Sequence, residues 1–134
     1  MRDFPCMKHK RIMLGIVFLL ALNSCEKIEL DEPVDCKVGT KYRIDNNLSF
    51  TIDSIRDYRC PKNVMCIWPG DVDVYLKIQH NFSSIERILN FHKTDNKPFH
   101  YDGYDWELLK VEPYLETGQY ADQKDYTISL KINN

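Results

Sequence analysis

The stretch VDVYLKI, residues 72–78, alternates apolar side chains with polar or amphipathic ones along its whole length. A period of two residues is typical of a β-strand that buries one face and exposes the other. The stretch YTISLKI, residues 126–132, repeats this pattern. These two segments therefore predict two strands, each with one side against a core and the other side in water.

Weaker alternation elsewhere in the chain predicts further strands. Residues 48–52 alternate, and a slip of phase before Ile55 indicates a β-bulge near residues 53–54. The remaining predicted strands are a weaker one at Tyr42 and Ile44 and another at residues 106–111, which also carries a change of phase.

The segment from Ser83 to His92 can be interpreted in two ways. Ser83 and Glu86 have the spacing of a helical capping box, and Ile85, Ile88 and Leu89 fit a helical period. The same segment also fits a strand that follows a hairpin loop, and a short isolated helix is only marginally stable. We favour the strand.

The spacing of these segments predicts an all-β protein of six to seven strands. No helical period is sustained, and turn residues separate the strands at short intervals. We expect an antiparallel β-sandwich of immunoglobulin-like form, with a small barrel as the alternative.

The start of the chain carries the pattern of a secretory signal. Four residues, 8–11, are basic or His, residues 12–22 are mostly apolar, and Ser24 precedes Cys25. The apolar run has about half of the roughly 20 residues that a bilayer-spanning helix needs. The end of the run resembles the lipobox of bacterial lipoproteins, although Asn23 stands where a small residue is usual. This resemblance implies lipidation at Cys25 and a membrane as partner through that anchor.

These features divide the chain into three parts. We expect a signal peptide at residues 1–24, a charged flexible tether at residues 25–34 and one β-sandwich domain at residues 35–134. The part after Ser24 has 14 basic and 19 acidic residues and no basic cluster, which argues against a nucleic-acid partner. The expected location is the cell envelope of a Gram-negative bacterium, lipid-anchored at the outer membrane on either of its faces.

The second informative stretch is DYRCPKNVMCIWPG, residues 57–70. It resembles a motif of small bacterial lipoproteins, DSRCP followed by three variable positions with Val among them and then C-x-W-x-G; in this chain residues 62–65 fill that interval. The chain departs from the motif at Tyr58, where the family usually has Ser, and at Pro69, where it usually has Ala. Residues 111–114 are similar to a late Val-x-Pro turn of the same family. The resemblance implies a β-sandwich and no particular activity.

Cys60 and Cys66 are expected to form a disulfide in an oxidising compartment. Such a short closed loop would stabilise the fold by about 2 kcal/mol. A metal site is disfavoured because no second Cys or His pair is near, and a redox pair because the spacing is not Cys-x-x-Cys. Cys36 is the odd thiol, and a buried free Cys is the first interpretation.

Arg59 and Trp68 each have a structural interpretation and a functional one. Arg59 can pair with Asp57 or Asp53 and so fix the loop. Trp68 can pack over the disulfide or present an aromatic face to a ligand, and we favour packing because large aromatic side chains are more often buried.

A candidate binding surface lies in FHYDGYDW, residues 99–106, where aromatic and acidic residues alternate around a glycine. Such surfaces stack on sugars or anchor protein partners. The alternative is that these side chains pack into the following strand. The candidate residues are Tyr101, Tyr104 and Trp106, with Trp68 from the cysteine block.

Catalytic patterns are weak in this sequence. His80, His92 and His100 could converge on zinc, but scattered His residues are more often found on the surface, and no Gly-x-Ser-x-Gly elbow occurs. We expect no enzyme, no cofactor, no metal site and no catalytic residue.

Two functions remain open. The first is a lipid-anchored binding or structural module of the envelope, with a protein or carbohydrate ligand. The second is an inhibitor of an envelope hydrolase that presents the Cys60–Cys66 loop as a rigid wedge. The inhibitor hypothesis requires that Val64, Ile67 and Trp68 are not all buried.

Overall fold

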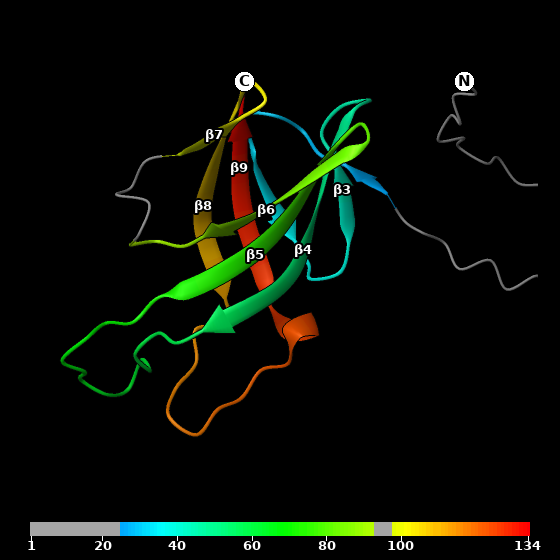
Figure 1. Ribbon diagram of the computed structural model, residues 1–134. Coiled ribbons are helices and arrows are strands. Elements are labelled where there is room, and N and C mark those ends of the chain that lie inside the picture. Colours follow the sequence, from blue (N-terminus) through cyan, green and yellow to red (C-terminus); the bar gives the residue numbers. More distant parts are fainter. Residues whose placement is uncertain (1–24, 93–97) are drawn as a thin grey trace, which may run out of the picture.

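The computed structural model describes residues 25–92 and 98–134, and this part of the chain folds into nine β-strands and one short 3-10 turn (Figure 1). The signal peptide predicted at residues 1–24 lies outside the described residues. The elements are β1 (Glu26–Lys27), β2 (Pro33–Cys36), β3 (Lys41–Arg43), β4 (Leu48–Asp57), β5 (Val72–His80), β6 (Ser83–Leu89), β7 (Phe99–Tyr101), β8 (Tyr104–Glu112), η1 (Gln123–Asp125) and β9 (Thr127–Asn133).

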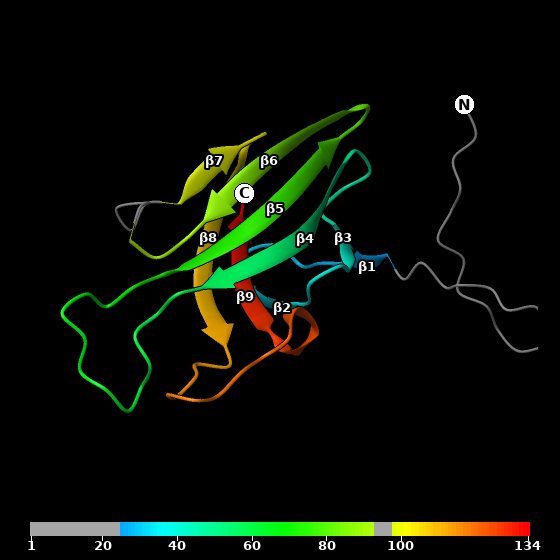
Figure 2. The ribbon, with the colours of Figure 1, turned by 60° about the horizontal axis from the view of Figure 1, so that its bottom comes forward.

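The strands form two sheets that lie face to face (Figure 2). One sheet has the order β1-β3-β4-β5-β6 and the other β2-β9-β8-β7. Every neighbouring pair is antiparallel except β1 and β3. The predicted all-β sandwich is therefore confirmed. The count of six to seven strands was too low, because β1, β2 and β7 have only two to four residues and carry no alternation that a sequence can show.

The core lies between the sheets and consists of the inward side chains of the alternating segments. Phe50 stacks on Tyr42 with ring centroids 5.3 Å apart and meets Trp106 edge to face at 5.2 Å. Burial of such apolar area is the main favourable term in folding. The buried side chains that the two decisive segments supply are Val72, Val74, Leu76, Ile78, Tyr126, Ile128, Leu130 and Ile132.

The predicted irregularities are found in the strands. The register of β4 against β5 shifts between Ile52 and Ser54, and that of β8 against β9 shifts between Leu108 and Lys110. Both shifts coincide with the changes of phase in the sequence. Residues 83–89 form strand β6, which confirms the strand interpretation of that segment.

The segment predicted as a tether differs from that prediction. β1 begins at Glu26, directly after Cys25, and pairs in parallel with β3. The Ile28 N–H donates to the Arg43 carbonyl at 3.1 Å, and the Ile28 side chain is buried. Pro33, at the start of β2, pairs with Lys131 on β9. The folded domain therefore begins at Glu26 and not at residue 35. Ile28 and Leu30 are the only apolar residues between Glu26 and Glu32, and two residues are too few to establish a period that predicts burial.

Cys36 is a buried free thiol, as expected. Burial raises its pKa to about 12, with a smaller contribution from the neighbouring Asp35 carboxylate. The thiol therefore behaves as a small apolar side chain of the core.

Candidate functional site

The four residues of the predicted binding surface lie in three separate places. Trp106 is wholly buried in the core, which corrects its assignment to a surface: the alternation of β8 turns its side chain inward. Tyr101 and Tyr104 are half-buried at the β7–β8 turn, where the Tyr104 hydroxyl donates to Asp45 at 2.9 Å. Trp68 lies at the opposite end of the sandwich, in the loop between β4 and β5 (Figures 1 and 2).

The loop between β4 and β5 begins with a stem in which two backbone hydrogen bonds continue the ladder of the two strands toward the disulfide. The Tyr58 N–H donates to the Asp71 carbonyl at 3.0 Å, and the Cys60 N–H donates to the Pro69 carbonyl at 2.8 Å. Beyond this ladder Cys60 is bonded to Cys66, which confirms the predicted disulfide. The loop is therefore held at its stem, and the disulfide closes a smaller ring of residues 60–66 within it.

Gly70 permits the close approach of the two sides of the stem. Its φ is +66°, and a Cβ there would lie 2.0 Å from the Tyr58 carbonyl oxygen. No side chain fits at that distance from backbone, so glycine is required for both reasons. Glycine at position 70 thus allows the two sides of the stem to meet directly before β5.

Arg59 ties the stem to the end of β8. Its guanidinium donates to both carboxylate oxygens of Asp57, at 2.8 and 2.6 Å, as the sequence predicted. Two further N–H groups donate to the carbonyls of Val111 and Pro113, both at 2.9 Å. The guanidinium also lies over the Tyr114 ring, 4.4 Å from its centroid. A planar guanidinium with four such hydrogen bonds to three different residues fixes one geometry.

Electrostatics around this cluster favour the ion pair. Burial alone would raise the pKa of Asp57, but its hydrogen bonds to Arg59 outweigh burial and hold that pKa below its ordinary value. Burial and the neighbouring Asp57 carboxylate raise the pKa of Tyr126 to about 12, and the Tyr126 hydroxyl donates to Asp57 at 3.2 Å. Asp57 thus stays ionised and Tyr126 neutral at physiological pH.

The β8–β9 connection supports the loop from its other side. The Tyr114 hydroxyl donates to the Cys60 carbonyl at 2.9 Å, and the Lys62 N–H donates to the Leu115 carbonyl at 3.1 Å. The Asn63 side chain accepts from the Thr117 N–H at 2.8 Å. Residues 60–63 of the loop are therefore hydrogen-bonded to the β8–β9 connection as well as to the opposite side of the stem. The tip of the loop extends beyond these contacts.

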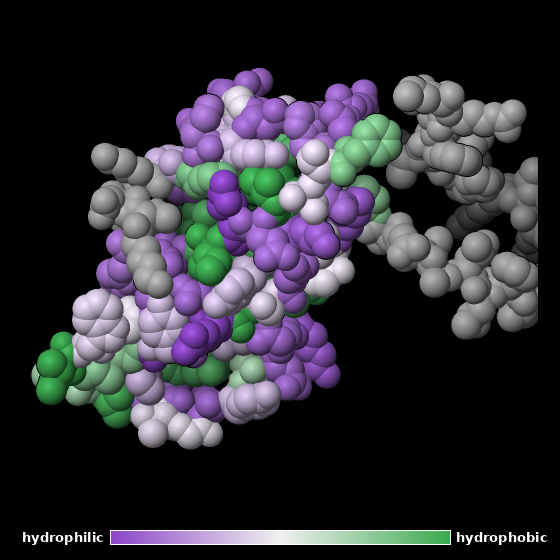
Figure 3. Space-filling view, viewed as in Figure 1, coloured by the Kyte–Doolittle hydropathy of each residue, from purple (hydrophilic) through white to green (hydrophobic). Residues whose placement is uncertain are grey.

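The tip of the loop exposes apolar side chains to solvent. Met65 and Ile67 are completely exposed, Trp68 is 66% exposed and Val64 is 46% exposed. Figure 3 shows green, hydrophobic surface at the lower left, over the loop. The expectation that Trp68 packs in the core was wrong: the loop projects beyond both sheets, and the ring of Trp68 lies beside that of His92, with 6.5 Å between the ring centroids, and outside the core. We call Val64, Met65, Ile67 and Trp68 the apolar tip.

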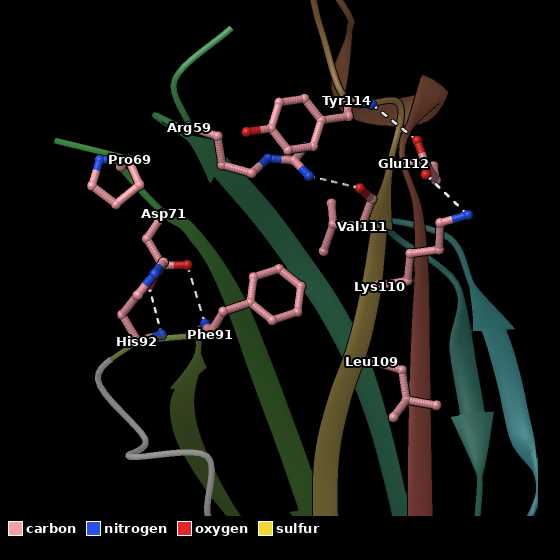
Figure 4. Close-up of a pocket in the computed structure, with 11 residues that line it drawn as sticks. Arg59, Pro69, Asp71, Phe91, His92, Leu109, Lys110, Val111, Glu112 and Tyr114 are labelled. Atoms are coloured by element: carbon pink, nitrogen blue, oxygen red, sulfur yellow. Dashed lines mark hydrogen bonds and ion pairs between the residues drawn. The ribbon is translucent and has the colours of Figure 1, made fainter. Parts of the chain in front are cut away.

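A hollow of about 360 Å³ lies at the foot of the loop (Figure 4). Asp71 organises one rim: its carboxylate accepts N–H bonds from Val72, Phe91 and His92 at 2.7, 3.1 and 2.9 Å. These bonds outweigh burial, which alone would raise the pKa of Asp71, and they lower it. The lining side chains that face the hollow are mainly apolar: Pro69, Phe91, Leu109, Val111 and Tyr114, with Arg59, His92, Lys110 and Glu112 at its edges.

Only part of this hollow could be predicted from the sequence. Leu109 faces outward because β8 alternates from the inward Trp106. The bulge after Leu108 leaves Lys110 outward as well, so that Val111 is buried again, and the change of phase in the sequence marks that point. Met65 and Ile67 could have been noticed as large apolar residues inside a loop bounded by Pro61 and Gly70. Phe91 carried no signal that sets it apart from a core residue.

The three histidines do not converge. His80 lies 3.6 Å from Asp102, His92 lies 3.0 Å from Asp71, and His100 lies 2.8 Å from Asp105. Within residues 25–92 and 98–134 no group of three or more potential metal ligands is found. The zinc trio considered from the sequence is not formed by these residues.

Comparisons with family models, with curated proteins and with solved structures give no match to this chain. The resemblance to small bacterial lipoproteins therefore stays a prediction. In the described part of the chain, no helix has the length and apolar character needed to span a bilayer.

Proposed function

We propose that this protein is a lipid-anchored binding module of the bacterial cell envelope, and that the apolar tip of the β4–β5 loop recognises a protein partner. The address rests on the lipobox pattern that ends at Cys25. The envelope in question is that of a Gram-negative bacterium, with the anchor in the outer membrane. The binding role rests on the loop.

The observation that carries the proposal is the exposure of Met65, Ile67 and Trp68 on a loop that is fixed in place. Large apolar side chains that cluster on a surface mark interaction sites more often than chance exposure does. The disulfide and the Arg59 cluster hold the loop before any partner arrives. Binding therefore costs little ordering entropy, which is the usual benefit of preorganisation.

A protein is favoured over a carbohydrate as the ligand. Sugars are recognised by an aromatic face together with polar groups that bond their hydroxyls. Met65 and Ile67 offer no hydrogen bonds, and Trp68 is the single aromatic residue of the tip. Tyr101 and Tyr104 lie at the other end of the sandwich and cannot add a second aromatic face (Figure 1).

A second candidate function is inhibition of an envelope hydrolase by the same loop. The loop protrudes, is closed by Cys60–Cys66, and exposes the side chains that a wedge requires. Hydrolase active sites are concave clefts, which a projecting loop fits better than a flat surface does. The two functions share one surface and differ in whether the partner loses activity.

The test is site-specific photo-crosslinking in the native envelope. A benzophenone amino acid replaces Ile67 in the full-length protein, and the matched control replaces Tyr120, which is 85% exposed on the β8–β9 connection. We expect one protein adduct from position 67 and none from position 120. The crosslinked peptide of the partner is expected to map to a single concave site.

The same experiment in a Cys60→Ser, Cys66→Ser background examines the role of the closed loop. Loss of the adduct together with an unchanged fold supports a preorganised recognition element. An adduct of equal yield from positions 67 and 120, or adducts spread over many proteins, contradicts specific recognition. An activity assay of a partner that is a hydrolase then decides between binding and inhibition.

A further inference from the structure

No flexible linker separates Cys25 from the folded part of the described chain. Glu26 and Lys27 already pair with Tyr42 and Arg43 on β3, and Ile28 is buried. A lipoprotein with a long tether can take any orientation at its membrane. A lipid on Cys25 would instead hold one particular end of this sandwich close to the bilayer.

The end of the sandwich next to Cys25 is known from its neighbours. Cys25 lines a surface hollow together with Lys41, Arg43, Asn47 and Asn81. Asn81 belongs to the turn between β5 and β6. The next residue in that turn is Phe82, whose side chain is completely exposed. The ion pair of His80 with Asp102 and the hydrogen bond of Tyr104 to Asp45 bring the β7–β8 turn to the same end.

We propose that this end of the sandwich lies on the lipid surface in which the acyl chains of Cys25 are embedded, and that Phe82 enters the membrane interface as a second contact. This inference rests on the lipidation of Cys25 in the proposed function. Aromatic side chains favour the interfacial region of a bilayer, and amphipathic Tyr side chains such as Tyr101 and Tyr104 fit its edge.

The charges at this end are compatible with a lipid surface. Lys41 and Arg43 line the hollow beside Cys25, and basic side chains are attracted to an anionic membrane. Glu26 and Asp102 are acidic residues at the same end. Asp45 is the acidic residue of the hollow, and its carboxylate is engaged by Tyr104 and by the N–H groups of Asn47 and Leu48. A bilayer is favoured over a protein partner here because the acyl chains of Cys25 place lipid at this surface.

The orientation has a consequence for the apolar tip. β5 spans nine residues, which corresponds to roughly 30 Å of strand, and it runs from the disulfide loop to the turn that carries Phe82. With Phe82 at the bilayer, the tip extends into water on the far side of the domain (Figures 1 and 2). It is then presented to partners in the aqueous compartment and kept out of its own membrane.

The test uses the full-length acylated protein in nanodiscs of phosphatidylethanolamine and phosphatidylglycerol. Mass spectrometry first measures the acyl modification of Cys25. Nitroxide-labelled lipids are then added, and the loss of amide NMR signal is measured along the chain. We expect strong loss at residues 81–83 and little loss at residues 64–68. The variant Phe82→Ser is expected to lessen the loss at residues 81–83, while Tyr120→Ser, at another exposed aromatic residue, leaves it unchanged.

The outcomes separate this inference from the proposed function. An acylated protein with equal signal loss at both ends, or with greater loss at residues 64–68, overturns the orientation and leaves the partner-binding role of the tip intact. A protein without acyl chains on Cys25 overturns the anchor and this inference together. Phe82→Ser without effect overturns the second contact.

Discussion

Gly70 is the residue on which the geometry of the β4–β5 loop depends most directly. Its positive φ and its distance to the Tyr58 carbonyl oxygen are independent reasons for glycine. Gly39 has a similar φ of +81° but nothing within 4 Å of where a Cβ would be. The two glycines therefore allow the conformational cost to be separated from the steric one.

We predict that Gly70→Ala destabilises the fold more than Gly39→Ala. Both substitutions place an L residue in the left-handed region, at a cost of roughly 1–2 kcal/mol. Gly70→Ala must also displace the Tyr58 backbone, for a total on the order of 3 kcal/mol. Urea unfolding at neutral pH measures both. Equal losses for the two variants would show that the close approach at Tyr58 is not a constraint.

The ionisation of Asp57 makes the stability of the folded loop depend on pH. Its pKa in the fold is lower than the ordinary value of 3.8, so the ionised form favours the folded state. The contribution of ionised Asp57 to the free energy of unfolding is complete above about pH 4–5. It is lost as the pH falls through the lower pKa that Asp57 has in the folded state.

We predict that Asp57→Asn lowers stability at neutral pH by about 2 kcal/mol, because Arg59 loses a charged acceptor. The variant should also show a shallower fall in stability below the ordinary value of 3.8 than the wild-type protein does. Asp45 and Asp71, whose pKa values are also lowered, retain the remaining acid sensitivity. Asp53→Asn, at an exposed carboxylate, is the control. If the stability of Asp57→Asn depends on acidic pH in the same way as that of the wild-type protein, Asp57 does not cause the acid sensitivity.

At the scale of elements, the segment before β2 is part of the fold. β1 adds a parallel strand to the edge of β3, and Ile28 closes that corner of the core. An edge strand of two residues has few backbone bonds of its own, so its position depends on the buried side chain that follows it.

We predict that Ile28→Ala costs about 2 kcal/mol of stability, the low end for a buried Ile because the site lies at an edge. Glu29→Ala, at the next residue and fully outside the core, should cost less than about 0.5 kcal/mol. Chemical unfolding of the two variants measures the difference. If Ile28→Ala unfolds with wild-type stability, residues 26–28 are a tether after all.

Long alternating segments could be predicted from the sequence because their period of two reflects a buried face directly. Residues 72–78 and 126–132 are strands with the expected inward side chains, and even the bulges near Ser54 and Leu109 left a change of phase. The disulfide followed from the chemistry of cysteine. Short strands such as β1 and β7 could not be predicted, since two or three residues contain no period.

The candidate site was predicted only in part, for a different physical reason. Trp106 and Trp68 both stand among aromatic or apolar residues in the sequence, but Trp106 lies in a strand whose inner face is the core, and Trp68 lies in a loop that projects beyond the core. Burial of a loop aromatic depends on tertiary neighbours that a local pattern does not reveal. The Arg59–Asp57 pair was predictable because its partners are two residues apart.

The whole molecule has two ends with different character. The end with Cys25 carries basic side chains and the single exposed Phe82, and the end with Cys60 and Cys66 carries the apolar tip. A sandwich of two sheets separates them by the length of its strands. We propose that this polarity is functional, with membrane contact at one end and recognition of a protein at the other.

The central claim is that the apolar tip is the recognition surface, and the most direct test is the affinity for the partner captured from position 67. The measurement compares Ile67→Asp with Phe82→Asp, which place the same charge at fully exposed apolar residues of opposite ends. We predict that Ile67→Asp raises the dissociation constant at least about tenfold, a loss of affinity typical of an interface anchor. Phe82→Asp is expected to leave the dissociation constant unchanged. Unchanged affinity for Ile67→Asp, or an equal loss for both variants, would contradict the account.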